Sequence, residues 1–333
     1  MTHPIRVGVG GWSFEPWDET FYPPGLSKAK QLEYASRKLT AVEVNATYYS
    51  SFKPDTFAKW RDATPDSYVF SLKAHRFSTV RKTREDMKKS IDLFLDQGIT
   101  QLKDKLGPIN WQFPPTRRFE REYFDMFLSQ LPREKDKLPL RHALEVRHPS
   151  CNDPAFLDLL TKYGATVVYA EDDEFPKIRH EGSEFAVARL MQTKSDQPAG
   201  YPKSEIDRFA KMFTGWSKSQ DVYAFFISGA KERNPAAAMA LLAKLGLTPA
   251  TSGEADAPAG GKAAPKAIGR KPAAKASVKK PAPARAAAKK ASPKKKKWAP
   301  SLGNLLLQPL GELSASRRSR LPAHLGSYVG ERN

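Results

Sequence analysis

The sequence predicts an α/β fold, a closed (β/α)8 barrel of the TIM type, followed by a disordered basic tail. Short apolar runs alternate with longer amphipathic runs over residues 1–247, which is the pattern of βα units around a mainly parallel sheet. Eight apolar runs occur there, and this number within about 245 residues fits the usual size of such a barrel. The composition then changes to one dominated by alanine, lysine and proline.

The predicted strands and helices alternate along the barrel. We expect strands at residues 6–10, 41–45, 68–75, 108–113, 142–147, 166–172, 185–190 and 222–228. We expect helices at roughly 28–38, 54–61, 84–104, 119–131, 153–163, 204–218 and 235–245, whereas the link 173–184 is too short and polar for a full helix. An open doubly wound sheet is the competing architecture. Its first βα turn requires G-x-G-x-x-G, and GVGGWS places Ser13 at the last position.

Residues 248–300 form the predicted tail. They contain 17 Ala, 14 Lys or Arg and 8 Pro, with no aromatic residue before Trp298. Prolines recur too often for a helix to propagate, and too few large apolar residues are present to build a core. The predicted domains are therefore 1–247 for the barrel, 248–300 for the disordered tail and 301–333 for a C-terminal segment. In that last segment, three leucines at 305–307 suggest a short docking element.

The formal net charge of +19 belongs mainly to the C-terminal region. Residues 248–333 carry 18 Lys or Arg against 4 Asp or Glu, whereas residues 1–247 carry 37 against 32. Clustered lysines attract the phosphate backbone of nucleic acid and release its counterions, without reading the bases. We expect residues 262–297 to bind DNA or RNA non-specifically; a tail that only increases solubility is the alternative.

Cysteine content and hydropathy indicate the compartment. The single cysteine, Cys151, excludes an internal disulfide framework and a multi-cysteine zinc site, which suits a reducing environment. No run of about 18 apolar residues occurs, and no signal-peptide pattern precedes the first strand. We expect a cytoplasmic protein without membrane contact, and the basic tail adds the hypothesis of nucleoid association.

Polar residues share one phase of several predicted strands. In a barrel, alternate strand residues point inward and the carboxyl ends of the strands form the active face. The apolar phase suits packing against helices, which leaves the polar phase for the interior. The inward polar set comprises Glu43, Asn45, Ser71, Lys73, His75, Asn110, Gln112, Glu145, Arg147, Asp172 and Arg189. Because unpaired buried charges are costly, we expect these residues to ring a solvated mouth; a network of buried ion pairs is the alternative.

Five motifs resemble those of a known family. They are GVGGWSFEPW (8–17), VEVNATYY (42–49), KAHRFST (73–79), KLGPINWQFPP (105–115) and LEVRHPS (144–150). In order and spacing they are similar to the hallmarks of the domain-of-unknown-function 72 family, the YecE-like proteins, over nearly all of residues 5–247. The resemblance implies a (β/α)8 barrel, and it implies no established activity.

The resemblance also implies a set of polar positions. These fall on Trp12, Glu43, Asn45, Tyr48, Lys73, Arg76, Gln112, Glu145, Arg147 and His148. The second half departs from the family pattern: Met191 and Gln192 stand where His-Gly is usual, Ile227 and Ser228 replace an expected Asn pair, and Cys151 replaces Trp. If the missing groups take part in chemistry, this chain is an altered or inactive member.

Two function hypotheses follow. The first is an enzyme, a hydrolase of phosphoester or glycosidic bonds, acting on a small anionic ligand at the barrel mouth. Its catalytic residues would be Glu43 and Glu145, as general acid and base, and Lys73. Its ligand-binding residues would be Trp12, Asn45, Tyr48, Arg76, Gln112, Arg147, His148, Asp172 and Arg189. The second is a non-catalytic module that binds a ligand or partner and is anchored to nucleic acid by the tail; the departures favour this one.

No cofactor motif is evident in the sequence, and we assign no metal ligands. A divalent ion held by Glu43, Glu145, His148 and Asp172 stays open as a hypothesis. No H-E-x-x-H motif or comparable spacing supports it.

Overall fold

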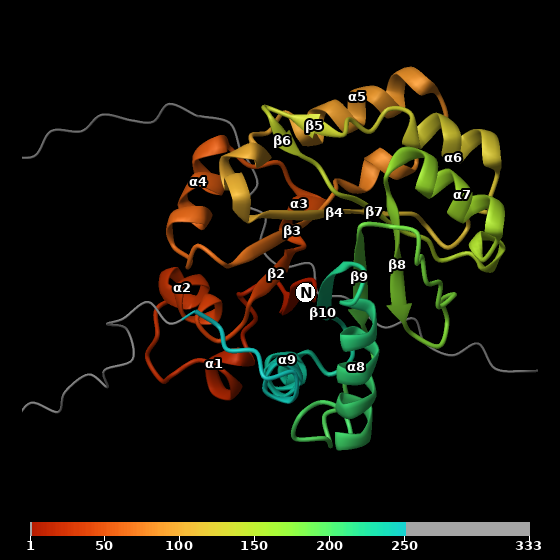
Figure 1. The fold of residues 1–333 in the computed structure, drawn as a ribbon. Helices are drawn as coiled ribbons and strands as arrows, with labels where there is room; N and C mark the ends of the chain where they lie inside the picture. The colour runs from red at the N-terminus through yellow and green to blue at the C-terminus, as the bar shows by residue number, and fades with distance from the viewer. Residues whose placement is uncertain (1, 251–333) are drawn as a thin grey trace, which may run out of the picture. The chain divides into compact units, whose positions relative to one another are not determined.

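The computed structural model describes residues 2–250, which form a closed barrel of eight parallel strands (Figure 1). The strands are β1 (Ile5–Gly10), β2 (Ala41–Val44), β3 (Val69–Lys73), β4 (Leu106–Gln112), β7 (His142–Glu145), β8 (Thr166–Glu171), β9 (Phe185–Leu190) and β10 (Asp221–Phe226). They pair in chain order around the ring, and β1 closes it against β10. The prediction of a (β/α)8 barrel is confirmed, and all eight strands lie where the apolar runs predicted them.

Helices surround the strands and follow the chain around the ring (Figure 1). They are α1 (Trp17–Thr20), α2 (Gln31–Ser36), α3 (Ala46–Tyr49), α4 (Pro54–Asp62), α5 (Arg84–Leu95), α6 (Arg121–Leu128), α7 (Pro154–Tyr163), α8 (Lys203–Trp216) and α9 (Asn234–Lys244). Short 3-10 turns add η1 (Lys28–Lys30), η2 (Arg76–Thr79), η3 (Ile99–Lys105), η4 (Pro149–Cys151) and η5 (Lys231–Arg233). As predicted, the link 173–184 contains no helix in the described chain.

Two details differ from the sequence prediction. The predicted helix 84–104 is two elements, because Gly98 adopts φ 98° and a left-handed residue ends a helix. A small antiparallel hairpin, β5 (Glu134–Lys135) with β6 (Leu138–Pro139), was not expected; its turn has Asp136 and Lys137 at positive φ. Neither difference changes the barrel.

Standard capping explains where several helices begin and end. Asp153 accepts a hydrogen bond from the backbone N–H of Ala155 before α7, and Pro154 occupies the first helical position. Gly164, at φ 65°, ends the same helix. Thr83 caps α5 by accepting from the N–H of Asp86. These short-range signals set the helix boundaries and, with them, the lengths of the loops that carry the site.

The two faces of the strands bury different side chains. The outer phase, such as Val7, Val42 and Leu144, packs with the helices in one large apolar core. The inner phase forms a smaller apolar cluster of Ala41, Ala143, Val168, Phe185, Val187, Tyr223, Phe225 and Ile227. Charged residues take over the inner phase near the carboxyl ends, where Glu43, Glu145 and Arg189 lie. The barrel interior therefore changes from apolar to ionic along its axis.

The last described helix completes this barrel. On α9, Ala237, Ala238, Leu241 and Leu242 are buried against β1 and β10. The predicted tail and the segment 301–333 lie outside the described residues, so the boundary at 247 stays a prediction. Among the helices of residues 2–250, none combines the length and apolarity that a membrane span requires.

Substitutions at two glycines test the packing of the barrel. A Cβ on Gly8 would lie 1.9 Å from the carbonyl oxygen of Ala41 on the neighbouring strand, a backbone atom that cannot rotate away. A Cβ on Gly215 in α8 meets nothing within 4 Å. We expect Gly8→Ala to destabilise the protein by about 3 kcal/mol or more. Gly215→Ala should stabilise it by about 0.5–1 kcal/mol through helix propensity. Urea unfolding measures both, and a neutral Gly8→Ala would contradict the β1–β2 register.

Candidate functional site

A bridged ionic cluster fills the upper interior of the barrel. The guanidinium of Arg189 donates to the carboxylate of Glu145 at 2.7 Å and to that of Glu43 at 3.2 Å. The side-chain amide of Asn110 also donates to both carboxylates, at 3.1 Å for Glu145 and 3.3 Å for Glu43. All four side chains are buried. One guanidinium and one amide therefore join strands β2, β4, β7 and β9.

Glu145 and Arg189 stay ionised in this cluster. Burial alone would raise the pKa of Glu145, but the positive charges of Arg189, Lys73 and Arg147 outweigh it and lower that pKa to about 2. Burial opposes the charge on Arg189 as well, yet the two carboxylates raise the pKa of the guanidinium. The expectation that the glutamates ring a solvated mouth is wrong, because Glu43 and Glu145 are both 0% exposed. The alternative of buried ion pairs describes them.

Arg147 extends the cluster towards the surface. Its Nε and Nη2 atoms donate to one oxygen of Glu145 at 3.0 and 2.7 Å, and Nη2 also donates to the side-chain oxygen of Gln112 at 3.2 Å. The guanidinium lies 4.5 Å from the ring centroid of Phe175. The Arg147 side chain stays 20% exposed, so a second fixed cation faces the mouth.

Lys73 ends β3 and differs from these arginines. Its side chain is buried, and its Nζ lies 4.6 Å from the ring centroid of Tyr48. Among residues 2–250 this amine makes no hydrogen bond and no ion pair. Burial and the charge of Arg189 lower the pKa of Lys73 to about 8, against an opposing pull from Glu145 and Glu43.

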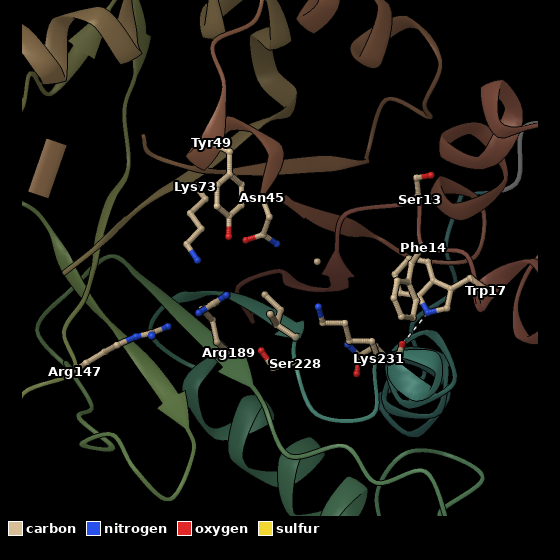
Figure 2. Close-up of a pocket in the computed structure, with 13 residues that line it drawn as sticks. Ser13, Phe14, Trp17, Asn45, Tyr49, Lys73, Arg147, Arg189, Ser228 and Lys231 are labelled. Atoms are coloured by element: carbon tan, nitrogen blue, oxygen red, sulfur yellow. Dashed lines mark hydrogen bonds between the residues drawn. The ribbon is translucent and has the colours of Figure 1, made fainter. Parts of the chain in front are cut away.

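A cavity of about 350 Å³ opens above the cluster (Figure 2). It is lined by Gly10, Ser13, Phe14, Trp17, Asn45, Tyr49, Lys73, Arg147, Arg189, Ile227, Ser228, Lys231 and Asn234. Four of these residues are cations, and among the described residues that line it none is an aspartate or glutamate. Figure 2 shows the side chains of Lys73, Arg189 and Lys231 directed towards the common space. The cavity is thus cationic, with the carboxylates beneath its floor.

Two distant loops form the far wall. The indole N–H of Trp17 donates to the carbonyl of Lys231 at 2.7 Å, which joins the first βα loop to η5 (Figure 2). Thr193 donates to the side-chain oxygen of Asn234 at 2.8 Å and so ties the loop after β9 to α9. Between these contacts Ser228 adopts φ 69°. The wall therefore comes from loops, which strand alternation does not predict.

Comparison with known proteins identifies the family. The family described as "Protein of unknown function DUF72" matches residues 6–261. The chain is a DUF72 protein. The resemblance that the five motifs carry is confirmed.

Curated relatives and solved structures agree with this. The UPF0759 protein YunF of Bacillus subtilis is 26% identical over 159 residues, 46% of this chain and 54% of that protein. The UPF0759 protein YecE of Escherichia coli is 27% identical over 146 residues, 44% and 49% of the two chains. The matched part thus spans about half the length of these curated relatives.

Two solved DUF72 structures share the fold. One from Enterococcus faecalis has a TM-score of 0.57 at 18% identity and covers 74% of this chain and 99% of its own. One from Thermotoga maritima has a TM-score of 0.57 at 22% identity, covering 72% and 97%.

The structure brings together only part of the predicted site of this DUF72 protein. Asn45, Lys73, Arg147 and Arg189 line the cavity, Tyr48 and Gln112 hold two of these cations, and Glu43 and Glu145 lie beneath them. The predicted site residues did not include Ser13, Phe14, Trp17, Tyr49, Ile227, Ser228, Lys231 and Asn234. The position of Tyr49 directly after Tyr48 could have indicated its place at the cavity. Ile227 and Ser228 could have been found because they lie at the end of a predicted strand.

Four predicted residues lie elsewhere. Trp12 packs edge-on against Trp60 at 5.2 Å, and Arg76 is exposed beside Phe77. Asp172 accepts from the N–H of Glu174, and His148 contacts the hydroxyl of Ser150 at 2.8 Å. The contacts of Arg76, Asp172 and His148 are local to their own loops, whereas Trp12 packs against helix α4.

The hypothetical metal ligands are therefore not assembled. The oxygens of Glu43 and Glu145 accept hydrogen bonds from Arg189, Arg147 and Asn110. His148 and Asp172 form their hydrogen bonds within their own loops. In the part of the chain that the structure describes, no three His, Cys, Asp or Glu side chains gather as a metal ion would require.

A pair of volume-conserving variants tests the cluster. Glu145→Gln leaves two guanidinium groups under-compensated, so we expect it to cost about 3–5 kcal/mol of unfolding free energy at pH 7. Lys73→Met removes an unpaired buried charge and should change stability by less than about 1 kcal/mol. Urea unfolding measures both, and equal losses would contradict the described pairing.

The stabilising effect of the Glu145 carboxylate should depend on pH. The folded-state pKa of Glu145 lies near 2, below its ordinary value. Its carboxylate therefore contributes stability that is present above the ordinary value and lost as pH falls towards 2. The difference between the wild type and Glu145→Gln should shrink over that window and stay constant from pH 6 to 7.

Proposed function

We propose that this DUF72 protein binds a small molecule carrying a phosphate or carboxylate group at the carboxyl ends of its barrel strands. The observation that carries the proposal is the cavity lining: Lys73, Arg147, Arg189 and Lys231 face it, and the carboxylates that neutralise the arginines lie beneath. Cations held in a partly buried space attract an anion more strongly than they would in water. Ligand sites of such barrels also lie at this face.

Glu43 and Glu145 fit a positioning role better than the general acid and base roles first expected. A general acid or base needs a pKa near the working pH and access to the ligand. Glu145 is buried, and its low pKa keeps it ionised. Both of its oxygens already accept hydrogen bonds from arginines. We therefore assign these carboxylates the task of fixing Arg189 and Arg147 towards the cavity.

Neutral groups would orient the rest of the ligand. Asn45, Tyr49 and Ser228 supply hydrogen-bonding groups around the opening, and Phe14 with Trp17 forms an aromatic wall. A few polar groups among apolar ones is the usual composition of a small-molecule site. A cavity of about 350 Å³ has the volume for a ligand of metabolite size.

A non-catalytic ligand-binding module is the second candidate. The observation in its favour is that the two carboxylates expected to transfer protons are locked in ion pairs. Hydrolysis of a phosphoester or glycosidic bond would then need another proton donor. The amine of Lys73, whose pKa is lowered to about 8 by burial and by the charge of Arg189, is a cavity group that exchanges a proton near physiological pH.

We also propose that the tail binds nucleic acid through its charge. Fourteen Lys or Arg stand within residues 248–300, and this composition supports backbone attraction without base recognition. This region lies outside the described residues, so the proposal rests on composition.

Thermal unfolding with inorganic phosphate tests the anion site. Phosphate at about a hundred times its Kd should stabilise the protein by about 2.7 kcal/mol, whereas glycerol should not. The double variant Lys73→Met/Lys231→Met should lose most of this gain. Lys162→Met/Lys244→Met is the matched control, because it removes two lysines that pair with Asp125 and Asp207 outside the cavity. An equal loss of phosphate stabilisation in both double variants would show that phosphate responds to the net charge of the protein and not to the cavity.

Fluorescence anisotropy tests the tail. Affinity for two unrelated DNA duplexes should be nearly equal and should fall by about 10³-fold or more between 50 and 200 mM salt. Deleting residues 248–300 should abolish binding. Full affinity in the shortened protein would place the nucleic-acid site in the barrel instead.

A further inference from the structure

We infer that Lys73 is a nucleophile that forms an imine with a carbonyl compound carrying an anionic group. The anionic half of this substrate rests on the proposed function; the reactive amine rests on Lys73 itself.

The amine of Lys73 is separated from the ion pairs of the neighbouring arginines. Lys73 is 8% exposed and its side chain reaches into the cavity (Figure 2). The neighbouring cations Arg147 and Arg189 are both ion-paired with Glu145. Within residues 2–250, by contrast, the Lys73 amine lies against the ring of Tyr48 and makes no hydrogen bond or direct ion pair. A buried amine with no acceptor of its own is free to react with a bound molecule.

The charges around Lys73 favour a neutral amine. The carboxylates that would otherwise pair with Lys73 are held by Arg189, Arg147 and Asn110. Burial and the adjacent Arg189 then lower the pKa of the amine to about 8, so a substantial neutral fraction exists near physiological pH. The neutral amine is the nucleophilic form, and a nearby cation is a known means of producing it.

The step balances without a further reagent. The nitrogen lone pair attacks the carbonyl carbon, a C–N bond forms, and the carbonyl π electrons move to oxygen. One proton passes from nitrogen to that oxygen to give the carbinolamine. The second amine proton leaves with the hydroxyl as water, and a C=N bond remains. Arg147 and Lys231, which also line the cavity, are placed to hold the anionic group meanwhile.

Reductive trapping in the full-length protein tests the inference. Glyoxylate, an aldehyde with a carboxylate, is added with sodium cyanoborohydride, and the adducts are located by peptide mass mapping. We expect labelling at Lys73 to exceed that at any other lysine at least tenfold at pH 8. The rate of imine formation should rise as pH passes through about 8, the pKa of the amine, because the neutral fraction of Lys73 grows over that range. Inorganic phosphate should slow it, and acetaldehyde, which lacks the anionic group, should label Lys73 more weakly.

Matched variants complete the design. Lys73→Arg keeps the positive charge and cannot form an imine, so the dominant adduct should vanish. Lys162→Arg, on the outer helix α7 where Lys162 pairs with Asp125, should leave it unchanged. Labelling of wild-type Lys73 no faster than that of the other lysines would overturn the inference, even where phosphate stabilises the protein and the anion site stands. Fast labelling by acetaldehyde and glyoxylate alike, without competition by phosphate, would instead overturn the anionic substrate class.

Discussion

Arg189 is bonded to two carboxylates at once, and the rest of the site depends on that bridge. Two glutamates inside a barrel would repel each other and lose their hydration, a cost that one shared guanidinium offsets for both. Because Glu145 also holds Arg147, the same bridge fixes a second cation at the mouth. Both carboxylates then accept hydrogen bonds from Arg189 and Asn110, and within residues 2–250 Lys73 makes no direct ion pair with either of them.

The barrel is suited to this arrangement because its strands converge. Glu43, Asn110, Glu145 and Arg189 come from strands far apart in the sequence, yet strand alternation directs all four inward. Small residues such as Ala41 and Ala143 fill the interior below them, so the ionic cluster rests on an apolar layer. The loops add the remaining wall, where Trp17 meets Lys231.

The sequence was sufficient for the fold and for part of the site, for identifiable reasons. Short apolar runs located all eight strands, and period-two alternation gave the inward phase of Glu43, Lys73 and Arg189. Alternation predicts whether a side chain points into the barrel, but it does not predict how far that side chain lies from solvent. It therefore did not distinguish the buried Glu145 from the partly exposed Arg147.

The loop residues of the cavity were not predicted from the sequence, for a different reason. The strand β8 ends at Glu171, whose carboxylate accepts from Tyr201, and Asp172 beyond it serves a local turn. Lys231 and Asn234 are positioned at the cavity by hydrogen bonds with Trp17 and Thr193, respectively. These partners are distant in the sequence, so no local sequence pattern predicts the contacts.

A crystal structure of the protein soaked in tungstate would locate a phosphate-like anion, because tungsten gives an anomalous signal. We expect a tungstate ion in the cavity, contacted by Lys73 and Lys231, with Arg189 still bridging Glu43 and Glu145. An empty cavity at saturating tungstate, or glutamate carboxylates turned into it, would contradict an anion site above the Arg189 bridge.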